Sequence, residues 1–163
     1  MERKSPLVLV ICTGNVCRSP LAAALLADRL SREGYPSIRV ESAGTHVARP
    51  APPLPYVVQV LAERGVDISG HRARLVTPEM LRRAALVLVM EKAQADHLRA
   101  LAPEVSPQLH RFSEIAGEEY DIRAPYQGSL WAHRLLAEEL AGLVDAGWRQ
   151  VVAWVTGASS PSP

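Results

Sequence analysis

Cys12 and Arg18 are the two residues whose types and spacing point most directly to chemistry. They begin and end the segment Cys-Thr-Gly-Asn-Val-Cys-Arg, which follows the apolar run 7–11 and precedes a helix-like segment starting at Ser19-Pro20. A thiolate is the reactive form of cysteine, and a helix N-terminus or a nearby guanidinium lowers a thiol pKa to roughly 3.5–7.5. The sequence therefore predicts an activated cysteine nucleophile beside a guanidinium group.

The same loop has the features of an anion-binding site. Successive backbone N–H groups and the planar guanidinium of Arg18 match the three equatorial oxygens of a phosphoryl group in transfer. Gly14 lets the backbone approach an anion, and Asn15 tolerates the left-handed conformation that a tight loop requires. The Ser19 hydroxyl can donate to the Cys12 sulfur. The expected phosphate-binding residues are Thr13, Gly14, Asn15, Val16, Cys17 and Arg18.

The residue types of this loop also fit two other kinds of structure. One is a buried structural cysteine in an ordinary strand-to-helix turn, because cysteine is among the most buried residue types. The combination of a buried strand, Cys-x5-Arg-Ser-Pro and a helix favours the catalytic interpretation. The other is a nucleotide-binding P-loop, which is excluded because no Gly-Lys-Ser/Thr follows.

The amino-acid composition limits which partners and which compartment the protein is expected to have. The chain has 163 residues, 48% hydrophobic, and a formal charge of +1 from 18 basic and 17 acidic side chains, so no global field recruits nucleic acid or a membrane surface. No run approaches the roughly 20 apolar residues of a membrane span. The chain has only two cysteines, both in one loop, and this is not the disulfide framework of a small secreted domain. We therefore expect the protein in the cytoplasm. We expect a monomer without a metal or cofactor.

Apolar strands alternate with helical segments along the chain. Strands are expected at 7–11, 38–42, 85–90 and 109–112. Helices are expected at 19–32, 56–64 and 92–101, and a short one is expected to begin at residue 77. A long final helix is expected where apolar residues recur at helical spacing, from Trp131 and Leu135 to Val155. This alternation predicts a single doubly wound α/β domain over 1–156, with about four parallel strands and helices on both faces. The tail 157–163 is expected to be disordered.

The motifs together resemble a known family. The chain resembles the low-molecular-weight protein tyrosine phosphatases in two segments, Val-Leu-Val-Ile-Cys-Thr-Gly-Asn-Val-Cys-Arg-Ser-Pro at 8–20 and Glu-Ser-Ala-Gly-Thr at 41–45. The similarity covers nearly the whole chain, through Gly-His-Arg-Ala-Arg at 70–74 and Pro-Tyr-Gln-Gly-Ser at 125–129. The resemblance implies that Cys12 forms a phosphocysteine, that Arg18 binds phosphate, and that the loop is supported by hydrogen bonds of Asn15, Ser19, Ser42 and His71.

Residues other than Cys12 and Arg18 also have ordinary alternatives. From the residues alone, Ser42 caps a strand end and His71 satisfies a local turn. Cys17 matches a family cysteine that closes a reversible disulfide with the nucleophile, and its alternative is a small apolar residue facing the core.

The sequence departs from the family at the general acid. Members usually carry Asp-Pro-Tyr before the last helix, whereas alignment on Pro-Tyr-x-Gly-Ser places Ala124 at the acid position. A phenol has a pKa of about 10, so loss of the acid slows the first step by roughly 10²–10⁴-fold. Either Asp121 replaces it, or Glu118 or Glu119 does, or the protein is a slow enzyme or a phosphate binder. The alternative for Asp121 is a solvated loop carboxylate.

Substrate preference depends on the loop and its rim. Related arginine phosphatases carry Thr where this chain has Val16, so Val16 favours phosphotyrosine in a phosphorylated protein or a small aryl phosphate. Tyr126 is expected at the cleft rim, where it can stack on an aryl group, although a surface tyrosine is equally ordinary. An arsenate reductase on the same loop needs further relay cysteines that are absent. A non-catalytic phosphate- or phosphopeptide-binding module remains as a different class.

Overall fold

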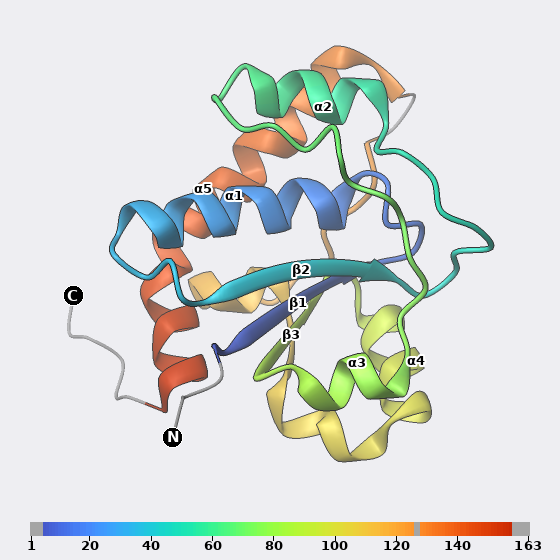
Figure 1. The fold of residues 1–163 in the computed structure, drawn as a ribbon, viewed down its shortest axis with the longest axis vertical. Helices are drawn as coiled ribbons and strands as arrows, with labels where there is room; N and C mark the ends of the chain where they lie inside the picture. Colours follow the sequence, from blue (N-terminus) through green and yellow to red (C-terminus); the bar gives the residue numbers. More distant parts are fainter. Residues whose placement is uncertain (1–4, 126–127, 158–163) are drawn as a thin grey trace.

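The computed structural model describes residues 5–125 and 128–157, in which four parallel strands form one sheet (Figure 1). The strands are β1 (Leu7–Cys12), β2 (Arg39–Gly44), β3 (Leu86–Val89) and β4 (Leu109–Arg111), in the order β2-β1-β3-β4. The helices are α1 (Arg18–Arg32), α2 (Pro55–Ala62), α3 (Pro78–Arg83), α4 (Lys92–Leu101) and α5 (Leu130–Thr156), with 3₁₀ turns η1 (Pro103–Gln108) and η2 (Phe112–Ala116). The predicted doubly wound domain is confirmed.

The apolar runs form the centre of the sheet because both of its faces are covered. Every residue of β1 and β3 is buried, as expected of parallel strands between helix layers. Val8 and Val10 pack into a core with α1, α2 and α5, whereas Leu9 and Ile11 face the opposite core with α3 and α4. Figure 1 shows α1 and α5 on one side of the sheet and α3 and α4 on the other.

The chain changes direction next to β1. It leaves β1 through α1 to β2 on one side, and then crosses to β3 on the other side. Cys12 pairs in register with Gly44, and Ile11 pairs with Val89. Ligands in such sheets bind beyond the carboxyl ends of the strands at this switch point. The loop after Cys12 occupies that position.

The long final helix was predicted correctly in extent but not in which of its first apolar residues are buried. Leu140 and Val151 are buried, but Trp131 is 69% exposed and Leu135 is 47% exposed. In this part of α5 the inward positions are taken by His133 and Leu136 instead, so Trp131 and Leu135 lie on the opposite side of the helix. The predicted tail lies outside the described residues apart from Gly157.

No helix within 5–125 and 128–157 combines the length and apolar character needed to cross a bilayer.

Gly147 marks the closest approach between α5 and the rest of the molecule. A Cβ atom at this position would lie 2.5 Å from the carbonyl oxygen and from Cγ1 of Ile115 in η2. Gly142 is on the same helix, and a Cβ atom there meets nothing within 4 Å. The helix therefore packs against the turn after β4 only because residue 147 has no side chain.

We expect Gly147→Ala to destabilise the protein by about 1–3 kcal/mol, because overpacking outweighs the gain in helix propensity. Gly142→Ala is the matched control and should stabilise by about 0.5–1 kcal/mol. Urea unfolding of both variants measures the two free energies. Equal stabilisation by both would show that α5 does not contact η2 this closely.

Candidate active site

Cys12 lies at the last position of β1, with its thiol at the base of the loop that leads into α1. The residue is only 2% exposed. Its Sγ is 3.0 Å from the Ser19 hydroxyl oxygen and accepts the backbone N–H of Asn15 at 3.3 Å. Two polar groups are therefore arranged around the sulfur, beside the N-terminal end of α1.

Asn15 organises this loop through its side chain and its backbone conformation. It is fully buried and is the only residue other than glycine with a positive φ (57°) in the described parts of the chain. Its Nδ2 donates to Ser19 Oγ at 2.8 Å and to Ser42 Oγ at 2.9 Å, and its Oδ1 accepts from Arg74 N at 3.0 Å. Because Asn15 donates to the Ser19 oxygen, the Ser19 hydrogen is left for an acceptor, and both Cys12 Sγ at 3.0 Å and Ala43 O at 3.5 Å lie within reach.

The carbonyl groups of the loop are bound by the surrounding protein. Four of them accept backbone N–H groups at 3.0–3.1 Å: Thr45 donates to Cys12, His46 to Thr13, Leu54 to Val16, and Leu21 to Cys17. The Asn15 carbonyl accepts from His71 Nε2 at 2.8 Å. Carbonyl and N–H groups of a peptide unit point in opposite directions. Turning these carbonyls outward therefore directs the N–H groups into the loop, where they form an anion-binding concavity.

His71 and Ser42 were predicted to support the loop, and the structure brings both to Asn15. A carbonyl oxygen is only an acceptor, so His71 must donate from Nε2 to Asn15 O. The predicted network of Asn15, Ser19, Ser42 and His71 is therefore present as a connected set of hydrogen bonds.

Gly44 was not singled out from the sequence, although it is essential to the loop's position. A Cβ atom here would lie 2.6 Å from Thr13 O and 3.1 Å from Asn15 Cβ. The signal available in the sequence was a glycine at the end of a strand, but only the strand register places it opposite Cys12.

Arg18 begins α1 and is 7% exposed. Its Nη1 donates to Ile122 O at 2.9 Å and forms an ion pair with Glu91 Oε2 at 3.2 Å. The guanidinium is thus placed by the end of β3 and by the segment before α5, both far away in sequence. Glu91 is a second site residue that sequence reasoning missed.

Gln94 connects β3 to the loop and was also missed. Its Oε1 accepts the N–H groups of Met90 at 2.9 Å and Glu91 at 3.0 Å, and its Nε2 donates to Thr13 Oγ1 at 3.1 Å and to Glu91 Oε2 at 3.2 Å. Both ends of a buried amide are therefore satisfied, which fixes its orientation. Gln94 holds the Thr13 side chain and the partner of Arg18 in one hydrogen-bond network.

Cys17 is half-buried and packs against the core on the α1 side of the sheet. Burial raises the pKa of its thiol to about 12, the neighbouring Cys12 adds to this rise, and Arg18 opposes it. Cys17 is therefore a neutral thiol near neutral pH. Both cysteines are free in this structure.

Among the acidic residues expected as substitutes, Asp121 is bound by groups outside the Cys12 loop. Asp121 Oδ1 accepts the N–H of Lys92 at 2.9 Å and Nη1 of Arg111 at 3.3 Å, at the start of α4 and the end of β4. Ala124 is exposed, as are Glu118 and Glu119. Tyr126, expected at the rim, lies outside the described residues.

No group of three or more potential ligands among His, Cys, Asp and Glu gathers within the described ranges. The arrangement around Cys12 instead combines a thiol, a guanidinium and converging backbone N–H groups, which suit a tetrahedral oxyanion.

Comparisons with known proteins agree with this chemistry. Residues 7–153 match the family model described as low molecular weight phosphotyrosine protein phosphatase. A probable low molecular weight protein-tyrosine-phosphatase EpsP from Ralstonia nicotianae is 39% identical over 85% of this chain and 91% of its own. A protein-arginine-phosphatase from Geobacillus stearothermophilus is 32% identical over 85% of this chain and 90% of its own.

A solved structure shows the same architecture. The crystal structure of the low molecular weight protein tyrosine phosphatase from T. tengcongensis superposes with a TM-score of 0.82 at 36% identity, covering 87% of this chain and 97% of that one. The family-model match over residues 7–153 spans the four strands and the helices from α1 to most of α5. The chain therefore belongs to the low molecular weight phosphotyrosine protein phosphatase family.

Proposed function

We propose that this phosphatase hydrolyses phosphotyrosine, or a small aryl phosphate, through a phosphocysteine on Cys12. The main support is the position of Cys12 Sγ, which lies 3.0 Å from Ser19 Oγ and 3.3 Å from Asn15 N. The sulfur lies at the base of a loop whose carbonyls turn outward. A nucleophile and an oxyanion-binding concavity on the same loop allow direct attack on a bound phosphoryl group.

The proposed reaction has two steps. The Cys12 thiolate forms a bond to phosphorus while the bond from phosphorus to the phenolic oxygen breaks, and the electron pair stays on the phenolic oxygen. Arg18 and the loop N–H groups hold the three equatorial oxygens during the transfer. Water then attacks the phosphocysteine, which releases inorganic phosphate and restores the thiolate.

Val16 supports an aryl substrate. It is half-buried, and its carbonyl accepts the N–H of Leu54 at 3.0 Å, which fixes its backbone in the loop. An apolar side chain suits the face of a phenyl ring and offers no acceptor to a guanidinium. The relationship to a protein-arginine-phosphatase makes phosphoarginine the second substrate to test.

Proton delivery to the leaving group is the step for which the chain is poorly equipped. Ile122 O accepts from Arg18, which brings the segment 122–125 to the site, and position 124 in that segment is alanine. Asp121 precedes Ile122, but its carboxylate accepts hydrogen bonds from Lys92 and Arg111. To act as the acid, Asp121 would have to leave both donors. We therefore infer that turnover of poor leaving groups is slow.

We also propose that the protein acts as a monomer in the cytoplasm. Two free cysteines support a reducing compartment, and the formal charge of +1 gives no general attraction for nucleic acid or membrane.

Cys12→Ser should abolish hydrolysis of p-nitrophenyl phosphate, because a serine hydroxyl is not ionised at neutral pH. The variant should still bind orthovanadate, since Arg18 and the loop N–H groups remain. Initial rates and vanadate-induced stabilisation in thermal unfolding measure the two properties. Wild-type rates in the variant would eliminate Cys12 as the nucleophile.

Ala124→Asp should raise kcat on phosphotyrosine by about ten- to a hundredfold, below the roughly 10²–10⁴-fold of an established acid. The gain should be smaller on p-nitrophenyl phosphate, whose leaving group hardly needs a proton. Asp121→Asn in the wild-type background is the matched control, and we expect little change in kcat. A large loss of kcat in Asp121→Asn would instead identify Asp121 as the acid.

A non-catalytic phosphopeptide binder is the second candidate, and Ala124 is the observation that favours it. The p-nitrophenyl phosphate assay separates the two, because a binder shows no turnover even with this easily lost leaving group.

A further inference from the structure

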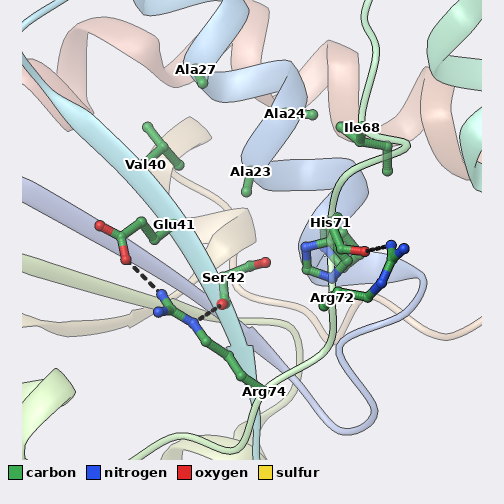
Figure 2. Close-up of a pocket in the computed structure, with 11 residues that line it drawn as sticks. Ala23, Ala24, Ala27, Val40, Glu41, Ser42, Ile68, His71, Arg72 and Arg74 are labelled. Atoms are coloured by element: carbon green, nitrogen blue, oxygen red, sulfur yellow. Dashed lines mark hydrogen bonds and ion pairs between the residues drawn. The ribbon is translucent and has the colours of Figure 1, made fainter. Parts of the chain in front are cut away.

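A pocket of about 410 Å³ lies behind the catalytic loop, between α1, β2 and the segment before α3 (Figure 2). Ala23 and Ala27 of α1, Val40 of β2 and Ile68 form its apolar surface. Figure 2 shows these side chains converging from the two elements and the crossing segment. Sites for small organic molecules are commonly apolar cavities of roughly 300–1,000 Å³ with a few polar groups.

Positive charge lies at the edge of this pocket. Arg74 donates to Glu41 Oε1 at 2.6 Å and to Ser42 O at 3.1 Å, while the other Glu41 oxygen pairs with Arg39 at 3.0 Å. Glu41 is thus shared between two arginines. Arg72 donates only to the carbonyls of Ser69 and His71 and has no carboxylate partner among the described residues. The edge therefore favours an anion.

The inner wall of the pocket is also part of the catalytic scaffold. Ser42 and His71 both line the pocket, and both hydrogen-bond to Asn15. A molecule in the pocket would contact these two residues directly. Any shift in either residue changes the hydrogen bonds that hold Asn15 in its left-handed conformation.

We propose that this pocket binds a small organic anion with an apolar body, and that its occupancy alters turnover at Cys12. The apolar surface would hold the body, and Arg72 would pair with the anionic group. The binding claim is independent of the proposed function, whereas the effect on turnover rests on it.

Binding is tested with 1-anilino-8-naphthalenesulfonate, an apolar anion whose fluorescence rises on binding. Orthovanadate is added at a concentration that occupies the Cys12 loop, so that the dye reports other sites. We expect saturable binding that weakens about two- to fivefold in Arg72→Gln, the effect of losing one partly exposed ion pair. Ala27→Trp should reduce binding further, because the indole would occupy the apolar surface.

Matched variants control for nonspecific binding. Arg83→Gln removes an exposed arginine of α3, and Ala141→Trp adds an indole beside a different groove, next to Arg29 and Val144. Neither should change the dissociation constant of the dye. If binding is equal in all four variants, or disappears when orthovanadate is added, the pocket is not the site.

The effect on turnover is measured with p-nitrophenyl phosphate at increasing dye concentration. We expect kcat to change at nearly constant KM in wild type and to stay constant in Ala27→Trp. A purely competitive effect, or an equal effect in Ala27→Trp, would contradict coupling through Ser42 and His71. If no hydrolysis is seen at all, the proposed function fails, and the fluorescence titration still decides whether the pocket binds an anion.

Discussion

The left-handed conformation of Asn15 is the constraint on which the rest of the site depends. A positive φ is costly for a residue with a side chain, and here it is held by hydrogen bonds from every polar group of a fully buried asparagine. The carboxamide contacts Ser19, Ser42 and the backbone of Arg74, the carbonyl accepts from His71, and the N–H donates to the Cys12 sulfur. The turn, the thiol and the outward carbonyls are thereby fixed together.

The sheet supplies the partners that this loop needs. Parallel pairing of β1 with β2 brings Ser42 and Gly44 beside the loop, and pairing with β3 brings Glu91 and Gln94 to its other side. These groups come from separate crossovers, so the loop is rigid only in the folded domain. In the proposed mechanism, this rigidity would let one loop hold both the thiol and the anion that the thiol attacks.

The residues expected in the Cys12 loop could be named from the sequence alone, because they are close neighbours along the chain. Cys12, Asn15, Arg18 and Ser19 lie within eight residues of one strand-to-helix turn, where residue type and spacing carry the geometry. Ser42 and His71 required the family resemblance, because no local pattern links them to Asn15.

Some positions could not be predicted in this way, because they are set by how strands pair or by which side of a helix faces the core. Gly44, Glu91 and Gln94 join the site only because neighbouring strands end at the same edge of the sheet. Trp131 and Leu135 follow the helical spacing, but periodicity does not determine which side of the first turns of α5 faces the core. The hydrogen bonds of Asp121 depend likewise on where α4 begins.

Phosphate capture and proton delivery are separable in this protein. In the proposed mechanism the first belongs to the Cys12 loop, and the second to the segment 122–125, in which position 124 is alanine. The most direct measurement is the single-turnover rate of phenol release from aryl phosphates whose leaving groups differ in pKa. Our account predicts that the logarithm of this rate falls steeply as the leaving-group pKa rises. A rate independent of the leaving-group pKa would contradict it, because a built-in acid would then be protonating the phenol.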